Sequence, residues 1–149
     1  MIFFTDRDLS SHIFITILRN AGLTVERHDD HFYQNTDDEV WLPAVGQRGW
    51  IALSRNSNIY YQNNERDAMF RAGTRLFLLV GSRATFPDLA NNFVACIHKI
   101  ERFLKTHSSP FIARVYLPTP EQRLRGSQKS GEIKLWLSYE EWLAKLANR

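Results

Sequence analysis

The sequence predicts an α/β protein with an open, mainly parallel sheet and helices on both of its faces. Short apolar, β-branched segments alternate along the chain with segments in which apolar residues recur at a spacing of three to four, the order of repeated strand–helix units. The run 75–81 is almost continuously apolar, as in a strand buried on both faces. A length of 149 residues suits a single domain over 1–149 with a sizeable core.

Composition excludes several classes of protein. Hydrophobic residues make up 44% of the chain and aromatic residues 13%, which argues against disorder. No apolar run approaches the ~20 residues of a membrane-spanning helix, and the start is too acidic and too short in apolar residues for a signal peptide. Cys96 is the only cysteine, so an internal disulfide is excluded and the cytoplasm is the expected compartment.

Charge is unevenly distributed. Residues 1–98 contain 9 Lys/Arg and 11 Asp/Glu, a net charge of −2, whereas residues 99–149 contain 10 and 5, a net charge of +5. An acidic pole with a basic tail is typical of a metal centre beside a track for a polyanion. A solvated basic helix and loop explains the same distribution.

The first third of the chain predicts strand, helix and strand. Residues 2–5 are the first strand. A helix over 9–21 follows, with Asp8 or Ser10 as its N-cap and Gly22 just past its last turn. Residues 23–28 form the second strand, and a unit of this length fits a right-handed crossover.

The middle of the chain continues the alternation. Thr36 and Glu39 have the spacing of a capping box that opens the next helix, with Pro43 inside it as a kink or a sign of a late start. Residues 50–54 predict the third strand, and 64–72 a short helix.

The last part predicts the remaining elements. Residues 75–81 form the fourth strand, 85–107 one long helix and 111–117 the fifth strand. A mobile basic loop over 118–131, with Arg123, Arg125 and Lys129, precedes a strand over 132–137 that pairs with 111–117 as a hairpin. A capping box at Ser138–Glu141 opens a final helix, whose Trp142, Leu143 and Leu146 dock on the core or form a partner or dimer surface.

Polar side chains follow the predicted strands at their carboxyl ends, where open α/β folds bind ligands. Asp6 and Asp8 follow the first strand, Asp29 and Asp30 the second and Asn56 the third, while Asp38 begins a helix that leads to the third strand. If these strands are neighbours, the groups converge and suit Mg²⁺ or Mn²⁺. Such an ion activates water for phosphoryl displacement. The alternative is structural: Asp8 caps a helix and Asp6 lies in a turn.

A second polar cluster, His28-Asp29-Asp30-His31, follows the second strand. Four potential ligands in a row suggest a metal site, but adjacent residues rarely all face one ion. A polar loop, or side chains that line a pocket, is the alternative.

Several segments together resemble PIN-like domains, and the nearest group is the VapC-type toxins of bacterial toxin–antitoxin pairs. The segments that carry the resemblance are 3–9, 21–25, 28–32, 37–42, 48–56 and 111–116. It covers about residues 2–117, a PIN-like core of Rossmann type, and leaves 118–149 as a C-terminal extension with an extra strand and helix.

The resemblance implies a Mg²⁺- or Mn²⁺-dependent endoribonuclease that cuts RNA, often tRNA or rRNA, and is silenced by a cognate antitoxin. It also implies a homodimer. Asp6 and Asp38 match two acids of the family, and Asn56 falls where another aspartate is usual. The expected catalytic residues are Asp6, Asp38 and Asn56, and the expected metal ligands are Asp6, Asp38 and Asp8.

Arg7 and Arg55 flank the expected metal edge of the sheet. They bind the scissile phosphate, since guanidinium groups suit it, or they form ion pairs with the same acids.

Asn56 motivates an alternative function. Its amide offers a cation a neutral oxygen but no charge, so another acid must substitute: Asp8, Asp29, Asp30 or Glu39. Otherwise the chain is a catalytically degenerate PIN-like module that binds RNA or protein. A third class, the haloacid-dehalogenase-type phosphatases, shares the Asp6-x-Asp8 pattern but needs a later lysine, and the sequence has none between Asp8 and residue 98.

Overall fold

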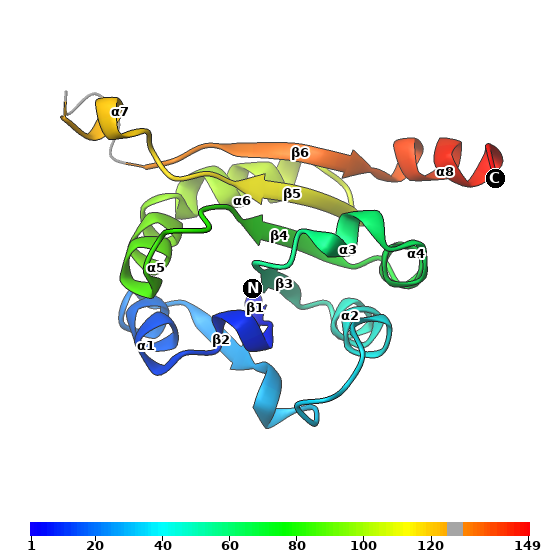
Figure 1. Ribbon diagram of the computed structural model, residues 1–149, viewed down its shortest axis with the longest axis horizontal. Coiled ribbons are helices and arrows are strands. Elements are labelled where there is room, and N and C mark those ends of the chain that lie inside the picture. The colour runs from blue at the N-terminus through cyan, green and yellow to red at the C-terminus, as the bar shows by residue number, and fades with distance from the viewer. Residues whose placement is uncertain (125–129) are drawn as a thin grey trace.

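The computed structural model describes residues 1–124 and 130–149. Within them it shows the predicted α/β architecture, a central sheet with helices on both faces (Figure 1). The strands are β1 (Ile2–Thr5), β2 (Thr24–Arg27), β3 (Ile51–Ser54), β4 (Arg75–Leu79), β5 (Phe111–Val115) and β6 (Ile133–Ser138).

The strand order is β2-β1-β3-β4-β5-β6, and every pair is parallel except β5 with β6. The first three strands therefore lie side by side, which is the condition for their polar ends to converge. The predicted hairpin-like pairing of 132–137 with 111–117 is confirmed. Because the parallel strands all run the same way, the residues that follow β1, β3 and β4 reach one edge of the sheet.

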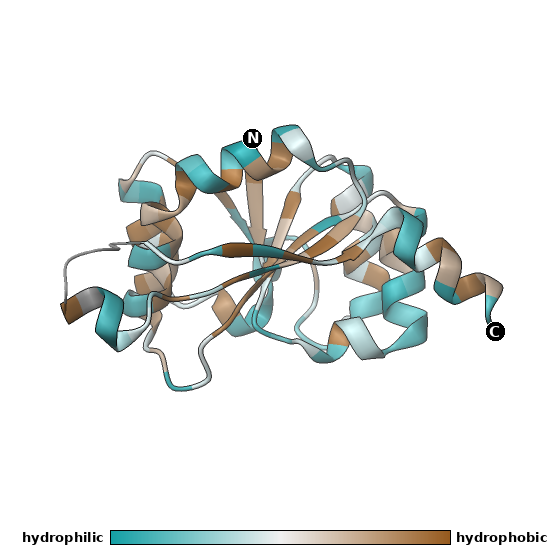
Figure 2. Cartoon of the chain, turned by 90° about the horizontal axis from the view of Figure 1, so that it is seen from above, coloured by the Kyte–Doolittle hydropathy of each residue, from teal (hydrophilic) through white to brown (hydrophobic). Residues whose placement is uncertain are grey.

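Alternate residues of each strand enter two separate cores. On one face Phe3, Leu53 and Phe77 pack against α1 (His12–Asn20), α5 (Phe86–Ala95) and α6 (Ile97–Thr106). On the other face Phe4, Ala52 and Leu76 pack under α2 (Asp38–Gln47), α3 (Asn58–Tyr61), α4 (Asn63–Arg71) and α8 (Tyr139–Ala147). Figure 2 shows the apolar strands in the middle of the molecule and hydrophilic residues on the outer helices. This period of two, with both faces buried, explains the nearly continuous apolar runs.

The long helix predicted over 85–107 is divided into α5 and α6 at Cys96. Near the break, Oδ1 of Asn92 accepts the N–H of Gly131 and Nδ2 of Asn92 donates to the carbonyl of Tyr116. Lys99, one turn beyond the break, donates to the carbonyl of Gly131. Each helix is thereby fastened to the segment between β5 and β6. The apolar spacing continues across Cys96, so the sequence pattern alone does not show the break.

Two predicted helix caps are wrong by one residue. Ser11 caps α1 through its hydroxyl, which accepts the N–H of Phe14. The hydroxyl of Ser10 instead donates to the carbonyl of Asp6, and Asp8 lies in a short 3₁₀ turn, Arg7–Leu9. The predicted capping box at Thr36 and Glu39 does not form, because α2 begins at Asp38 with Asp37 as its N-cap.

The C-terminal extension begins within the predicted loop 118–131, where Pro120–Leu124 form the short helix α7. Arg125 and Lys129 of that predicted basic loop lie outside the described residues. The capping box at Ser138 and Glu141 is confirmed and opens α8. In the described part of the chain, no helix has the length and apolar character needed to cross a membrane.

Candidate metal centre

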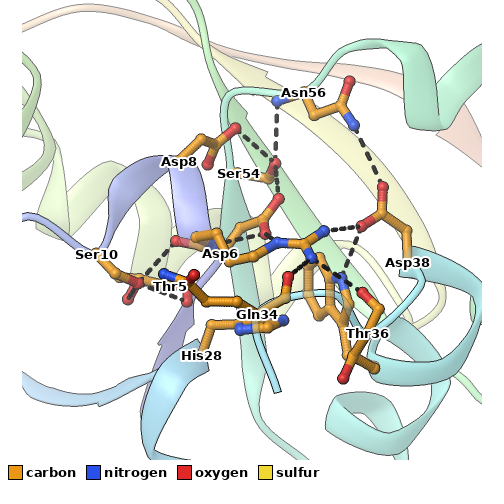
Figure 3. A network of polar contacts seen from close by, with 12 residues as sticks. Thr5, Asp6, Asp8, Ser10, His28, Gln34, Thr36, Asp38, Ser54 and Asn56 are labelled. Atoms are coloured by element: carbon orange, nitrogen blue, oxygen red, sulfur yellow. Dashed lines mark hydrogen bonds and ion pairs between the residues drawn. The ribbon is translucent and has the colours of Figure 1, made fainter. Parts of the chain in front are cut away.

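The candidate site lies at the carboxyl edge of β1 and β3, where a helix from the second core begins. Asp6 directly follows β1 and continues its pairing, since its N–H donates to the carbonyl of Leu53 at 2.9 Å. Ser54 is the last residue of β3, and Asn56 follows in the next turn. Asp38 is the first residue of α2. The structure brings Asp6, Asp8, Asp38 and Asn56 together at this edge, around Ser54, which was not among the expected site residues (Figure 3).

The hydroxyl of Ser54 joins two of the carboxylates. It is fully buried and lies 2.8 Å from Oδ2 of Asp6 and 3.4 Å from Oδ2 of Asp8. It also accepts the N–H of Asn56 at 3.0 Å. A single donor between two carboxylates cannot neutralise both of them, so the pair carries more negative charge than its neighbours offset.

Asp8 has the less satisfied carboxylate of the two. Its Oδ2 also accepts the N–H of Arg55 at 3.0 Å, but its Oδ1 is buried and has no hydrogen-bond partner among the described residues. A buried acceptor without a donor is costly. This oxygen is therefore free to bind a cation or a proton.

The pKa values of both aspartates reflect this crowding. Burial, followed by the neighbouring charge of Asp6, raises the pKa of Asp8 to about 7. Burial also raises the pKa of Asp6, although the hydrogen bond from Ser54 lowers it in part. Raised pKa values of this origin are typical of carboxylates that share a functional site.

Asp38 has more donors around it. Oδ1 accepts the indole N–H of Trp41 at 2.8 Å and Nη2 of Arg7 at 3.2 Å, and Oδ2 accepts the amide of Asn56 at 3.3 Å. Trp41 is fully buried, so its indole fixes the carboxylate in place. Asp38 is thereby oriented toward the strand ends where Asp6 lies.

Arg7 supplies a positive charge between Asp6 and Asp38. Its Nε lies 3.9 Å from Oδ1 of Asp6 and its Nη2 3.2 Å from Asp38, while Nη1 donates to the carbonyls of Gln34 and Thr36. Of the two roles considered for Arg7, the structure shows the ion pair. Phosphate binding by Arg7 stays a prediction.

Asn56 differs from an aspartate in the way it meets the site. Its amide nitrogen faces Asp38, while its Oδ1 accepts the N–H of Asn58 at the start of α3. The orientation follows from the hydrogen bonds, since the two ends of an amide have nearly the same shape. Asn56 therefore positions Asp38 and bonds to the first residue of α3, and in this orientation it gives a cation no oxygen.

The other acids and histidines considered as ligands lie elsewhere. Asp29 and Asp30 are exposed in a turn after β2, and Glu39 is exposed on α2. His31 pairs with Glu26 at 2.9 Å. His28 is fully buried beside the rings of Phe4, Phe32 and Trp41. Neither of its ring nitrogens has a hydrogen-bond partner among the described residues, although Nδ1 lies 3.5 Å from Oδ1 of Asp29.

Sequence reasoning missed Glu65, in the first turn of α4. Its Oε2 is buried without a described partner, and burial, then the charges of Asp38 and Glu39, raises its pKa. In the sequence, an acid in the first turn of a helix is explained by the helix dipole. Only the packing of α4 beside α2 shows that Glu65 adds a negative charge near Asp38.

The donor set fits a hard cation in part. In the described residues, no group of three or more His, Cys, Asp or Glu side chains is arranged to hold a metal ion. Asp6 and Asp8, however, meet at Ser54, and Asp8 has an oxygen with no partner among the described residues. These carboxylate oxygens suit oxygen-preferring ions such as Mg²⁺ or Mn²⁺, whereas the guanidinium of Arg7, paired with Asp6 and Asp38, opposes a cation at its position.

Comparison with known proteins gives one match. A family model described as a PIN-like domain matches residues 1–81, which is more than half of the chain. Those residues include β1, α2, β3 and β4, and with them every residue of the candidate centre. No curated protein and no solved structure matches the chain.

Proposed function

Because the chain belongs to the PIN-like domain family, whose members are of nuclease type, we propose that it is a metal-dependent endoribonuclease. In this proposal it is the toxin of a type II toxin–antitoxin pair and acts on cytoplasmic RNA. The observation that carries the proposal is the carboxylate pair Asp6–Asp8 at the end of β1, joined by Ser54 and faced by Asp38. The VapC-type resemblance supports the toxin role, the antitoxin partner and the homodimer.

Asp6, Asp8 and Asp38 would hold Mg²⁺ or Mn²⁺ in this centre. The ion supplies an activated water and stabilises the charge of an in-line phosphoryl displacement. Ser54 orients the two aspartates, and Trp41 with Asn56 orients the third. Because burial raises the pKa of Asp8 to about 7, an ion bound here would have to displace a proton from this carboxyl near neutral pH.

The surroundings of the centre favour an RNA phosphate. The backbone N–H of Arg55 bonds to Asp8, while its guanidinium donates to the carbonyl of Gly81 at 3.0 Å. That side chain therefore lies beside the carboxylates, forms no ion pair with them, and lowers the pKa of Asp8 only in small part. We propose that Arg55 binds the backbone of the substrate, since a guanidinium fork matches phosphate.

Cleavage of RNA and growth inhibition by wild-type and Asp6→Ala proteins test the proposal. The wild-type chain is expected to cut single-stranded RNA with Mn²⁺ but not with EDTA, and to slow the growth of a bacterial host when induced without an antitoxin. Asp6→Ala removes one carboxylate of the pair and is expected to abolish both effects. Retention of both effects in Asp6→Ala would overturn the assignment.

A second candidate is a degenerate PIN-like module that binds RNA or protein without cutting. Asn56 favours it, because its amide nitrogen rather than an oxygen faces Asp38, and so does Arg7, whose guanidinium already pairs with that carboxylate. A rigorously nuclease-free preparation that cuts RNA only with Mn²⁺ would exclude this candidate.

A further inference from the structure

A cavity of about 400 Å³ lies beside the candidate centre, at the carboxyl ends of β4 and β5. Arg55, Ser57, Ser82 and Arg114 line it together with the backbone around Gly81. Since β3, β4 and β5 are consecutive in the sheet, the cavity lies on the side of Asp8 away from β1 and β2. Its size is in the range of small-ligand sites.

Two arginine side chains line this cavity without a carboxylate partner. None of the ion pairs among the described residues includes Arg55 or Arg114. Arg55 is held by its bond to the carbonyl of Gly81 and lies 5.9 Å from the centre of the Phe86 ring. Two guanidinium groups that form no ion pair in the described part of the chain make this hollow attractive to an anion.

Arg114 is held by stacking rather than by an ion pair. Its guanidinium lies 4.1 Å from the centre of the Trp136 ring. Tyr60 stacks on the same indole at 3.9 Å with an angle of 3° between the planes. Stacking uses the face of the guanidinium and leaves its in-plane N–H groups available. Its Nε is buried and has no hydrogen-bond partner among the described residues, so a ligand in the cavity would meet the terminal Nη groups rather than Nε.

We propose that this cavity binds a backbone phosphate of single-stranded RNA, next to the phosphate at the carboxylate centre. The proposal rests on the proposed function, which places one RNA phosphate at the carboxylates. Arg55 connects the two places, because its backbone N–H bonds to Asp8 and its side chain lines the cavity. The hydroxyls of Ser57 and Ser82 add neutral donors. Arg114 of β5 is thus a substrate-binding residue outside the segment that matches the family model.

An aromatic surface beside the cavity favours an unpaired strand over a free phosphate. The ring of Tyr61 is 65% exposed and lies edge-on, 5.8 Å from Trp136. Exposed aromatic rings stack unpaired bases with little sequence preference. A phosphate in the cavity would therefore have a surface for its base within reach.

The test is binding of a fluorescent single-stranded RNA of about ten nucleotides to the full chain in EDTA, measured by anisotropy over a series of salt concentrations. Arg114→Met removes the guanidinium and keeps an apolar stem against Trp136. It is expected to weaken binding about tenfold and to reduce the slope of log Kd against log salt by about 0.7, the loss of one phosphate contact on a single strand.

Arg71→Met is the matched control, since Arg71 is exposed at the end of α4, just before β4 begins at the opposite edge of the sheet. It removes the same charge and is expected to leave the slope unchanged. Ser82→Asp places a carboxylate in the cavity without altering the Tyr60–Trp136–Arg114 stack. It is expected to weaken binding as well, which keeps the test decisive if Arg114→Met fails to fold.

Equal slopes for Arg114→Met and Arg71→Met, no effect of Ser82→Asp, or no RNA binding by the wild type would each overturn the proposal. Adenosine 5′-monophosphate is titrated in parallel, and tighter binding of this mononucleotide than of RNA would show instead a site for a free nucleotide. Because EDTA removes any metal, these outcomes are independent of cleavage. A wild type that cuts RNA with Mn²⁺ while Arg114→Met keeps its slope would retain the nuclease proposal and refute only this cavity.

Discussion

At the scale of single residues, the main feature of the centre is that few hydrogen-bond donors contact the carboxylates of Asp6 and Asp8. Ser54 is the only side-chain donor that they share among the described residues. The backbone adds the N–H of Arg7 to Asp6 and the N–H of Arg55 to Asp8. Burial outweighs these bonds, which is why the pKa of each aspartate is raised rather than lowered. A bound cation would supply the charge that these neutral donors lack.

Ser54→Ala tests this arrangement. Removing the hydroxyl takes away a donor to two buried carboxylates and is expected to lower the free energy of unfolding by about 1–3 kcal/mol. Urea denaturation measures the change. Ser57→Ala, an exposed neighbour, is the control and is expected to stay within about 0.5 kcal/mol of wild type. Equal stability of both variants would show that Ser54 does not hold the pair.

Asn56→Asp tests whether the missing charge limits metal binding. The new carboxylate replaces a donor 3.3 Å from Asp38, so the melting temperature without metal is expected to fall. Mn²⁺ affinity is expected to rise at least about tenfold, because affinity follows the number of charged ligands. Calorimetry and thermal melts with and without Mn²⁺ measure both effects. Asn58→Asp, on the exposed start of α3, is the control, and identical affinities for the two variants would contradict the role given to position 56.

At the scale of elements, the placement of α2 sets the position of Asp38. A methyl group added at Gly46 would lie 2.1 Å from Oγ1 and 2.9 Å from Cα of Thr74. The hydroxyl of Thr74 donates to the carbonyl of Leu42 at 2.9 Å. The helix therefore approaches the start of β4 closely, and this contact depends on the absence of a side chain at Gly46.

Gly46→Ala is expected to push α2 away from Thr74 and to cost about 1–3 kcal/mol of stability, as in other overpacked cores. The same shift moves Asp38 and should weaken Mn²⁺ binding. Chemical denaturation and calorimetry measure the two effects. Val40→Ala on the exposed side of α2, where Val40 is 53% exposed, is the control. Wild-type stability in Gly46→Ala would show that the helix has room to spare.

The sequence predicted the strands well because their signal is local. Runs such as 75–81 carry both the apolar character and the β-branched or aromatic residues of buried strands, and all six strands lie within the predicted ranges or overlap them. The break at Cys96 was not predictable, because the apolar spacing of α5 continues into α6 across it. Caps were displaced by one residue where two adjacent polar residues, such as Ser10 and Ser11, compete for the position.

The site was predictable only in its main acids. Asp6 and Asp38 follow from strand ends, helix starts and family resemblance. Glu65 and the bridging role of Ser54 depend on the packing of α4 and β3 beside them, which the spacing of residues does not encode. The role of Arg114 was not predictable, because the residue pattern around it indicates only a position in a strand. Its stacking partner, Trp136, lies 22 residues later in the chain.

At the scale of the whole molecule, the C-terminal extension is fastened to the family core. The indole N–H of Trp142 on α8 donates to Oδ1 of Asp67 on α4 at 2.8 Å, and Arg149 pairs with the same carboxylate at 2.5 Å. The prediction that the apolar stripe of α8 docks on the chain's own core is confirmed for Trp142, which is 4% exposed. Leu143 is 43% exposed and stays available for a partner.

Asp67→Asn tests this connection through its pH dependence. The hydrogen bond from Arg149 is the largest of the effects that lower the pKa of Asp67 below 3.8. The unfolded chain therefore binds this proton more readily than the folded chain. The stabilisation is complete well above pH 3.8 and is lost as the pH falls through the lowered pKa.

Asp67→Asn is thus expected to be less stable than wild type at neutral pH and to approach it at low pH. Urea denaturation over a pH series measures the difference between the two proteins. A difference that does not change with pH would show that the charge of Asp67 does not fasten the extension.

The most direct test of the central claim is calorimetric titration of Mn²⁺ into wild type, Asp6→Ala and Asp30→Ala, with RNA cleavage assayed on the same samples. Wild type and Asp30→Ala are both expected to bind the ion and to cut RNA, and Asp6→Ala is expected to do neither. Asp30→Ala is the control because Asp30 is exposed and lies outside the centre. Failure of the wild type to bind Mn²⁺ and to cut, or equal binding by Asp6→Ala, would contradict a metal centre at the end of β1.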